Sequence, residues 1–176
     1  MANEPVPTII DSSEGPLHFQ EYLVKRRAEP TVRAIRFDQV EKAHPAPGVL
    51  ESIRDAARIL ICPSNPLISI GPILAVRGIR EALRTRRKDV VAVCPIVAGK
   101  SLKGPSDKML AQLGHDPSAA GVAKLYADFT GTFVIDPADE SQESAIESLG
   151  LKVFVTPTVM QTLAQKRKLA RALLSL

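Results

Sequence analysis

The chain has 176 residues and a mass of 19.0 kDa, with 45% hydrophobic and 24% charged residues. This composition is typical of a globular domain and excludes a chain that is disordered throughout. No apolar run approaches the roughly 20 residues of a membrane helix, and we expect no secretory leader. The two cysteines form no disulfide framework. We therefore expect one domain over residues 1–176, a cytoplasmic location and no membrane partner.

The charge is mildly basic, with a formal net charge of +4, but it is uneven along the chain. Two basic clusters stand out: Arg77, Arg80, Arg84, Arg86, Arg87 and Lys88 in one, Lys166, Arg167, Lys168 and Arg171 in the other. They could bind phosphate, nucleic acid or an acidic membrane, or they could be solvated helix ends that complement the helix dipole. We favour helix ends. No aromatic residues interleave with the clusters, so we expect no nucleic-acid partner.

The first half of the chain predicts short elements separated by proline-rich turns. Residues 32–37 alternate apolar and polar side chains, which indicates a strand with one wet face. Pro47 is typical of the first turn of a helix that ends near Ala57. The other predicted elements are a helix over 17–27, a buried strand over 58–62, a loop over 63–72 and a helix over 73–86.

The second half repeats an order of strand, loop and helix. The predicted strands are 89–94, 132–136 and 151–155, and the predicted helices are 105–113, 118–126, 141–149 and 159–174. Gly150 is expected to end the third of these helices as a left-handed cap. Short connections between such elements favour an α/β fold with a mostly parallel sheet and crossover helices.

The loop from Cys62 to Pro72 follows a predicted strand, and ligands of parallel sheets bind at the carboxyl ends of strands. It carries the hydroxyls of Ser64 and Ser69, the amide of Asn65, and Gly71 shortly before a helix. Helix N-termini suit phosphate, so we favour a ligand site. The alternative is a stiff turn in which Ser or Asn caps the helix.

A second loop, over 96–105, combines glycine with lysine. Gly99 and Gly104 would allow close approach of a ligand to the backbone, while Lys100 and Lys103 could neutralise an anion. A flexible surface loop is the alternative. The triplet that begins at Gly99 is similar to the end of a P-loop, but Cys94 occupies the place of the upstream glycine, which excludes that motif.

A third loop, over 136–140, follows the predicted strand 132–136. Its acidic residues could hold Mg²⁺. We favour the alternative that Asp139 caps the helix near Ser141. Cys62 and Cys94 both end predicted strands without a histidine base nearby in the sequence, so we expect both to be small buried apolar residues rather than nucleophiles.

Several segments resemble the CofD-type 2-phospho-L-lactate transferase family. The central motif lies in Ile61–Pro66 and Ser69–Val76. The resemblance continues in Val93–Pro95, Gly99–Lys100, Lys103–Met109, Gly121–Ala123, Leu125–Phe129 and Phe133–Asp136, and upstream in Gly15–Val24. It covers nearly all of the chain, from about Val6 to Ala172.

The resemblance implies a Rossmann-like α/β fold and a transferase of coenzyme F-420 biosynthesis. Such an enzyme would move a 2-phospho-L-lactyl or phosphoenolpyruvyl group from a guanosine diphosphate-linked donor to the deazaflavin Fo. GMP would leave, Mg²⁺ would be needed, and a homodimer is expected. The residues implied in substrate binding are Ser64, Asn65, Ser69 and Gly71 around the nucleotide diphosphate, and Gly99, Lys100, Lys103 and Gly104 near the donor or acceptor.

The chain departs from the family at Arg77, Cys94 and Ala98, where proline, serine and glycine are common. The family also begins with a Gly-Gly-Thr-Gly loop and aspartates that would hold the metal, and neither occurs in this sequence. We therefore expect the chain to match the C-terminal half of the family fold, with little or no transferase activity alone. Three alternatives remain. The first is a YvcK-like nucleotide-sugar-binding regulator, which is not an enzyme, and the second is a flavodoxin-like domain, which would need phosphate loops that this chain lacks. The third is a basic nucleic-acid-binding domain.

Overall fold

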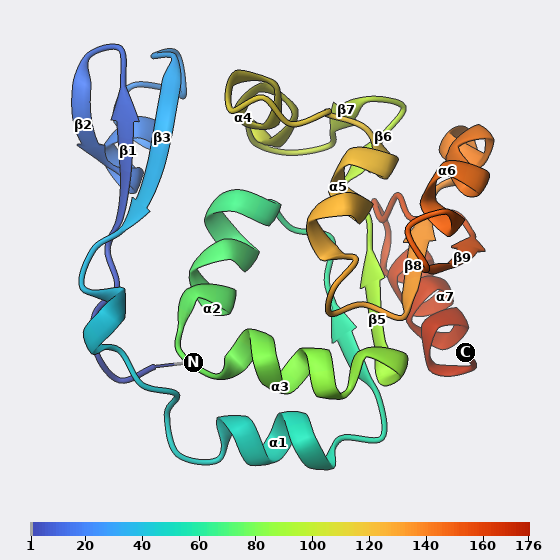
Figure 1. The fold of residues 1–176 in the computed structure, drawn as a ribbon. Coiled ribbons are helices and arrows are strands. Elements are labelled where there is room, and N and C mark those ends of the chain that lie inside the picture. The colour runs from blue at the N-terminus through green and yellow to red at the C-terminus, as the bar shows by residue number, and fades with distance from the viewer. Residues whose placement is uncertain (1) are drawn as a thin grey trace.

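A four-stranded parallel sheet forms the centre of the computed structural model, which describes residues 2–176 (Figure 1). Its strand order is β4-β5-β8-β9, with β4 at Ile59–Ile61, β5 at Val90–Val93, β8 at Thr132–Ile135 and β9 at Lys152–Val155. All three neighbouring pairs are parallel, so the predicted α/β fold with a parallel sheet is confirmed.

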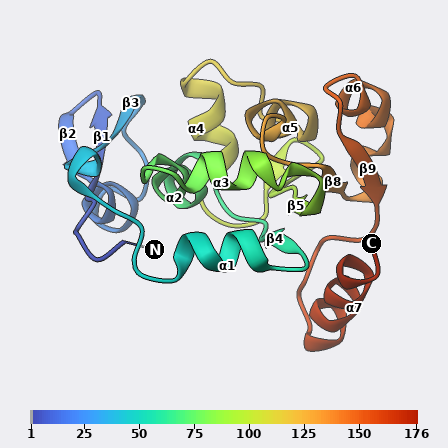
Figure 2. The ribbon, with the colours of Figure 1, turned by 60° about the horizontal axis from the view of Figure 1, so that its bottom comes forward.

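Helices cover both faces of this sheet (Figures 1 and 2). On one face, Ala92 of β5 and Phe133 of β8 pack with helix residues, among them Ile79, Leu83, Val122 and Ile146. On the other face, Leu169 and Leu173 pack over β5 and β8. The helices are α1 at Val49–Asp55, α2 at Gly71–Ala75, α3 at Ile79–Thr85, α4 at Ser106–Gln112, α5 at Ala119–Tyr126, α6 at Glu143–Glu147 and α7 at Leu163–Leu174.

The strand β4 is less buried than the sequence suggested. All four residues of β5 are buried, as expected for a central parallel strand. Leu60 in β4, by contrast, is 37% exposed. It is paired with Val91 at the edge of the sheet, beyond the residues that α7 covers. The prediction of a buried strand over 58–62 was therefore wrong at this edge.

The N-terminal segment forms a separate antiparallel sheet with the order β2-β1-β3. Its strands are β1 at Thr8–Ser12, β2 at Gly15–His18 and β3 at Val32–Phe37, so the predicted strand over 32–37 is confirmed. The helix expected over 17–27 is only partly present. Leu17 pairs with Ile10 as part of β2, and a π-helical turn, η1, covers Glu21–Lys25.

The helix α4 connects the two sheets. Met109 of α4 packs with Ile10, Tyr22 and Val32 of the N-terminal part. The ammonium of Lys108 also donates to the carbonyl of Ala28, at 2.6 Å, and to that of Glu29, at 2.8 Å. Figure 1 shows α4 beside the loop that leaves the central sheet. The N-terminal sheet therefore lies where it can contribute to a site at the end of the central strands.

Several helix boundaries differ from their predictions. The expected helix over 73–86 is two helices, because Gly78 has a φ of 86° between α2 and α3. The helix α7 begins after Thr162, which forms a capping box with Gln165, and not at residue 159. The helix α1 begins after Gly48, so Pro47 precedes it. Gly150 does adopt the expected left-handed conformation, with a φ of 77°.

Short 3-10 helices complete the secondary structure: η2 at Val40–Lys42, η4 at Arg87–Asp89 and η5 at Pro137–Gln142. A π-helical turn, η3, covers Pro66–Ile70 and leads directly into α2, so most of the predicted loop over 63–72 is helical. No helix in residues 2–176 is long and apolar enough to cross a membrane.

The first basic cluster supports the fold. Arg80 donates to the carboxylate of Asp128 at 2.6 Å and lies 5.1 Å above the Phe129 ring. Arg86 donates to the carbonyl of Ala56 at 2.7 Å, and Arg87 donates to that of Gly150 at 2.6 Å. These arginines bind carbonyls and carboxylates of neighbouring segments, in keeping with a structural role at a helix end. The cations of α7 lie on its exposed side.

Candidate functional site

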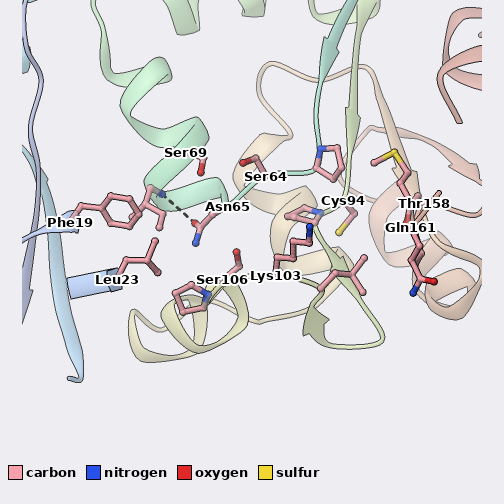
Figure 3. A pocket seen from close by; sticks show the side chains of 18 residues that line it. Phe19, Leu23, Ser64, Asn65, Ser69, Cys94, Lys103, Ser106, Thr158 and Gln161 are labelled. Carbon is pink, nitrogen blue, oxygen red and sulfur yellow. Dashed lines mark hydrogen bonds between the residues drawn. The ribbon is translucent and has the colours of Figure 1, made fainter. Parts of the chain in front are cut away.

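A cavity of about 620 Å³ lies at the carboxyl ends of β4, β5 and β9 (Figure 3). Its walls come from four segments: Pro63, Ser64, Asn65, Ile68 and Ser69; Cys94, Pro95 and 102–106; 158–161; and Phe19 and Leu23. The first two are the loops that the sequence singled out. Their convergence follows from the parallel sheet, whose strands all end at the same edge.

In the first loop, Asn65 builds the local structure as well as facing the cavity. Its side-chain oxygen accepts hydrogen bonds from the backbone N–H groups of Leu67, at 2.8 Å, and Ile68, at 3.2 Å. Its amide nitrogen faces the sulfur of Met109 at 3.7 Å. Asn65 is therefore the N-cap of η3, with Pro66 as the first helical residue. Ser64 and Ser69 also line the cavity.

Gly71, predicted to contact the nucleotide, does not line the cavity. It lies inside the continuous helical segment from η3 to α2 and has ordinary helical dihedral angles. A Cβ atom at this position would lie 3.1 Å from the Phe37 ring and 3.2 Å from the carbonyl oxygen of Pro66. The glycine thus permits close packing of the N-terminal segment against α2.

The second loop is a small hairpin with β6 at Ile96–Val97 and β7 at Lys100–Ser101. Ala98 and Gly99 form its turn with positive φ angles of 49° and 73°. Lys103 and Gly104 line the cavity, and Figure 3 shows the Lys103 side chain extending into it. Gly99 and Lys100 are not among the lining residues.

Lys100 is directed to a carboxylate instead. Its ammonium lies 3.5 Å from Asp107, the second residue of α4, and its side chain is 81% exposed. Ser101 donates to the same carboxylate at 2.6 Å. Burial raises the pKa of Asp107, but the Ser101 hydroxyl, nearby backbone N–H groups and Lys100 together hold it below its ordinary value. Of the two lysines predicted to meet a ligand, only Lys103 faces the cavity.

The third loop corrects the expectation for Asp139. The cap of the following helical segment is Asp136, which accepts the N–H of Ala138 at 3.2 Å. Asp136 also accepts the N–H of Thr158 at 2.9 Å and so fixes a cavity residue. Asp139 is 2% exposed, and its carboxylate accepts the N–H of Ala98 in the second loop. It caps no helix, because the hairpin lies against it.

The described residues do not fit a magnesium site. No three His, Cys, Asp or Glu side chains in residues 2–176 lie together in a way that could hold an ion. The cavity lining also contains no carboxylate. Hydroxyl and amide oxygens are neutral and supply none of the charge that carboxylates usually give to bound Mg²⁺.

The two cysteines differ in exposure. Cys94 is 2% exposed and lines the cavity, and burial raises the pKa of its thiol to about 12. The expectation of a buried, unreactive thiol is confirmed there. Cys62 is exposed, so the same expectation was wrong for it. It follows the sheet-edge strand β4, whereas Cys94 follows the central strand β5.

Sequence reasoning missed the residues that complete the cavity. Thr158 and Gln161 follow β9, and their position after a parallel strand was a signal that could have identified them. Ser106 begins α4 and is 3% exposed. Phe19 and Leu23 come from the N-terminal segment. No local pattern placed them here, because their position depends on how the second sheet packs against α4.

Comparison with known proteins identifies similar sequences along almost the whole chain. A family model described as 2-phospho-L-lactate transferase CofD matches residues 1–168. The chain is 42% identical over 174 residues to the 2-phospho-L-lactate transferase of Methanothermobacter thermautotrophicus, covering 99% of this chain and 55% of that protein. It is 41% identical over 161 residues to the phosphoenolpyruvate transferase of Kitasatospora aureofaciens, covering 91% and 50%.

The chain thus spans about half the length of the curated relatives it matches. Among solved structures, it is similar to a member of the UPF0052 family from Bacillus halodurans, with a TM-score of 0.65 and 18% identity. That match covers 98% of this chain and 59% of the other. At this identity the likeness concerns the fold, and it agrees with the α/β architecture described above.

Proposed function

The chain belongs to the CofD family of 2-phospho-L-lactate transferases, and we propose that it forms the substrate-binding part of such an enzyme. The enzyme would transfer a 2-phospho-L-lactyl or phosphoenolpyruvyl group from a guanosine diphosphate-linked donor to the deazaflavin Fo and release GMP. This reaction belongs to coenzyme F-420 biosynthesis. The family match favours it over a YvcK-like regulator.

The lining of the cavity carries this proposal. Part of the lining offers hydroxyl groups and a cation, from Ser64, Ser69 and Lys103. Other lining residues are apolar and include Phe19 and Leu23. A ligand with an anionic phosphate at one end and a planar ring at the other matches such a division. The proposed donor combines these two features, and the proposed acceptor supplies a planar ring.

The chain's own residues would bind and orient the substrates. Lys103 would attract a phosphate through its ammonium, while the hydroxyls of Ser64 and Ser69 would donate to the phosphate oxygens. Phe19 would contact a ring, and the apolar wall would exclude water from the reacting groups. Correct placement supplies much of the catalysis of phosphoryl-type transfer.

The groups that perform the chemical step are not assigned to this chain. The cavity lining includes no aspartate, glutamate or histidine that could act as a general base. Dependence on Mg²⁺ is part of the proposed reaction. We accordingly expect little turnover from the chain alone, and rapid turnover with Mg²⁺, donor and Fo would contradict this expectation.

Calorimetric titration of the chain with GDP and with a UDP-sugar tests the proposed ligand class. We expect GDP to bind more tightly than the UDP-sugar, and we expect Lys103→Ala to weaken GDP binding. Lys124→Ala is a suitable control, because Lys124 lies on α5 away from the cavity lining. A clear preference for the UDP-sugar would instead support the regulator.

A further inference from the structure

We propose that Asp139 is a positioning residue: it holds the hairpin loop of residues 96–105 so that Lys103 stays at the cavity. The proposal rests on the proposed function, because it gives Lys103 an anionic ligand to meet. Asp139 itself does not line the cavity. It would act through the loop rather than by contact with a substrate.

The contact between Asp139 and the loop is direct and buried. Both carboxylate oxygens lie close to the backbone nitrogen of Ala98, at 3.2 and 3.0 Å, and accept its N–H. Asp139 is 2% exposed, so water does not compete strongly for these oxygens. Hydrogen bonds to a charged acceptor are among the stronger ones in proteins. This bond therefore fixes the turn of the hairpin.

A relay of hydrogen bonds connects the same carboxylate to the rest of the fold. The side-chain nitrogen of Gln142 donates to Asp139 at 3.0 Å. The side-chain oxygen of Gln142 accepts the N–H of Ala120, at the start of α5, at 2.9 Å. Gln142 therefore connects Asp139 to α5, a helix that packs on the central sheet. Asp139 transmits that fixed position to Ala98.

The turn needs such a constraint. Ala98 has a φ of 49°, in the left-handed region that residues other than glycine seldom adopt. A second carboxylate holds the other end of the hairpin, since Asp107 accepts the Ser101 hydroxyl and pairs with Lys100. Between these anchors and α4 lie Leu102, Lys103 and Gly104, all of which line the cavity.

The arrangement also separates the two lysines of the loop. Lys100 is paired with Asp107, whereas Lys103 has no ion-pair partner in the described part of the chain. With the turn fixed by Asp139, the ammonium of Lys103 remains available to an anion in the cavity. Without that anchor, the turn could relax to an ordinary φ and the loop could leave the cavity.

A double-mutant cycle on pyrophosphate binding tests this role. Inorganic pyrophosphate would be titrated into the wild type, Asp139→Ala, Lys103→Ala and the double variant. If Asp139 acts through Lys103, each single change should weaken binding by roughly tenfold or more, the usual size for one hydrogen bond to a charged group. The double variant should then bind no more weakly than Lys103→Ala.

Hydrogen exchange provides a readout that does not depend on any ligand. Amides of residues 98–104 should exchange faster in Asp139→Ala, while those of β5 and β8 keep their protection. Asp139→Asn, which preserves the shape of the side chain, serves if the alanine variant does not fold. The matched control is Glu140→Gln, which alters the exposed neighbouring carboxylate.

The outcomes separate the two proposals. Unchanged exchange over 98–104 in both Asp139 variants overturns the anchor, even if pyrophosphate binds to the wild type. Additive losses in the cycle overturn the action through Lys103. Absence of pyrophosphate binding by the wild type overturns the anion subsite on which both the proposed function and this inference depend, whereas faster loop exchange would still identify the anchor.

Discussion

The two loops that leave β4 and β5 reach the same cavity but are stabilised in different ways. The first becomes helical almost at once, because Asn65 and Pro66 start a helical segment. The second remains a hairpin whose shape depends on carboxylates from other parts of the fold, Asp139 and Asp107. The first loop is thus held by its own local sequence, and the second by tertiary contacts.

The comparison extends to the cysteine at the start of each loop. Cys62 is exposed, whereas Cys94 is buried with a pKa of about 12. At pH 8 a thiol with that pKa is only about 10⁻⁴ ionised, and the thiolate is the reactive species. We therefore expect iodoacetamide to alkylate the exposed Cys62 at least about tenfold faster than the buried Cys94.

Mass spectrometry of peptides from timed alkylation measures the two rates. Protein unfolded in urea is the control, where both thiols should react at similar rates. Comparable rates in the folded protein would show that the cavity end of the second loop opens readily, which contradicts the difference in burial.

Asn65→Ala should break the local support of the first loop. It removes the acceptor of two backbone N–H groups at the start of η3, a position 9% exposed. Loss of such a cap costs about 1–2 kcal/mol of the free energy of unfolding. Urea denaturation would measure it. Ser69→Ala, in the same loop, is the control and should change the free energy of unfolding by less than about 0.5 kcal/mol. Equal losses in the two variants would show that the N-cap at Asn65 adds no particular stability.

Lys103→Ala and Lys100→Ala should separate the two lysines of the second loop. Lys103 lines the cavity, whereas Lys100 pairs with Asp107 and is largely exposed. We expect about tenfold weaker pyrophosphate binding for the first variant and less than about twofold for the second. Calorimetry at low salt provides both values. A larger effect at Lys100 would mean that Lys100, and not Lys103, meets the anion.

Ala98→Gly should produce the smallest effect. Glycine adopts the φ of 49° without steric cost, which removes about 1 kcal/mol of strain but adds freedom to the unfolded chain. We expect a net gain of about 0.5 kcal/mol in the free energy of unfolding. Thermal unfolding would detect it. A loss of stability would show that the strain relieved at residue 98 is smaller than the freedom that glycine adds to the unfolded chain.

Much of the site could be located from local patterns. The apolar runs and short connections predicted the parallel sheet, and the rule for its carboxyl edge placed the loops of Ser64 and Lys103 together. The same rule applied to β9 would have added Thr158. The prediction that Gly71 contacts the ligand failed because helical structure begins at Pro66 rather than at residue 73. No pattern in the sequence indicated the π-helical turn that causes this earlier start.

The sequence by itself determined the order of elements, the parallel sheet and the edge at which a ligand site forms, because these follow from hydrophobic patterning and connection length. The tertiary structure decided which side chains face the cavity. Lys100 forms an ion pair with Asp107, and Gly71 packs against the Phe37 ring. Asp139 accepts a hydrogen bond from the backbone N–H of Ala98. Each outcome depends on a contact between residues distant in the chain or between neighbouring segments, and such contacts exist only once the fold has formed.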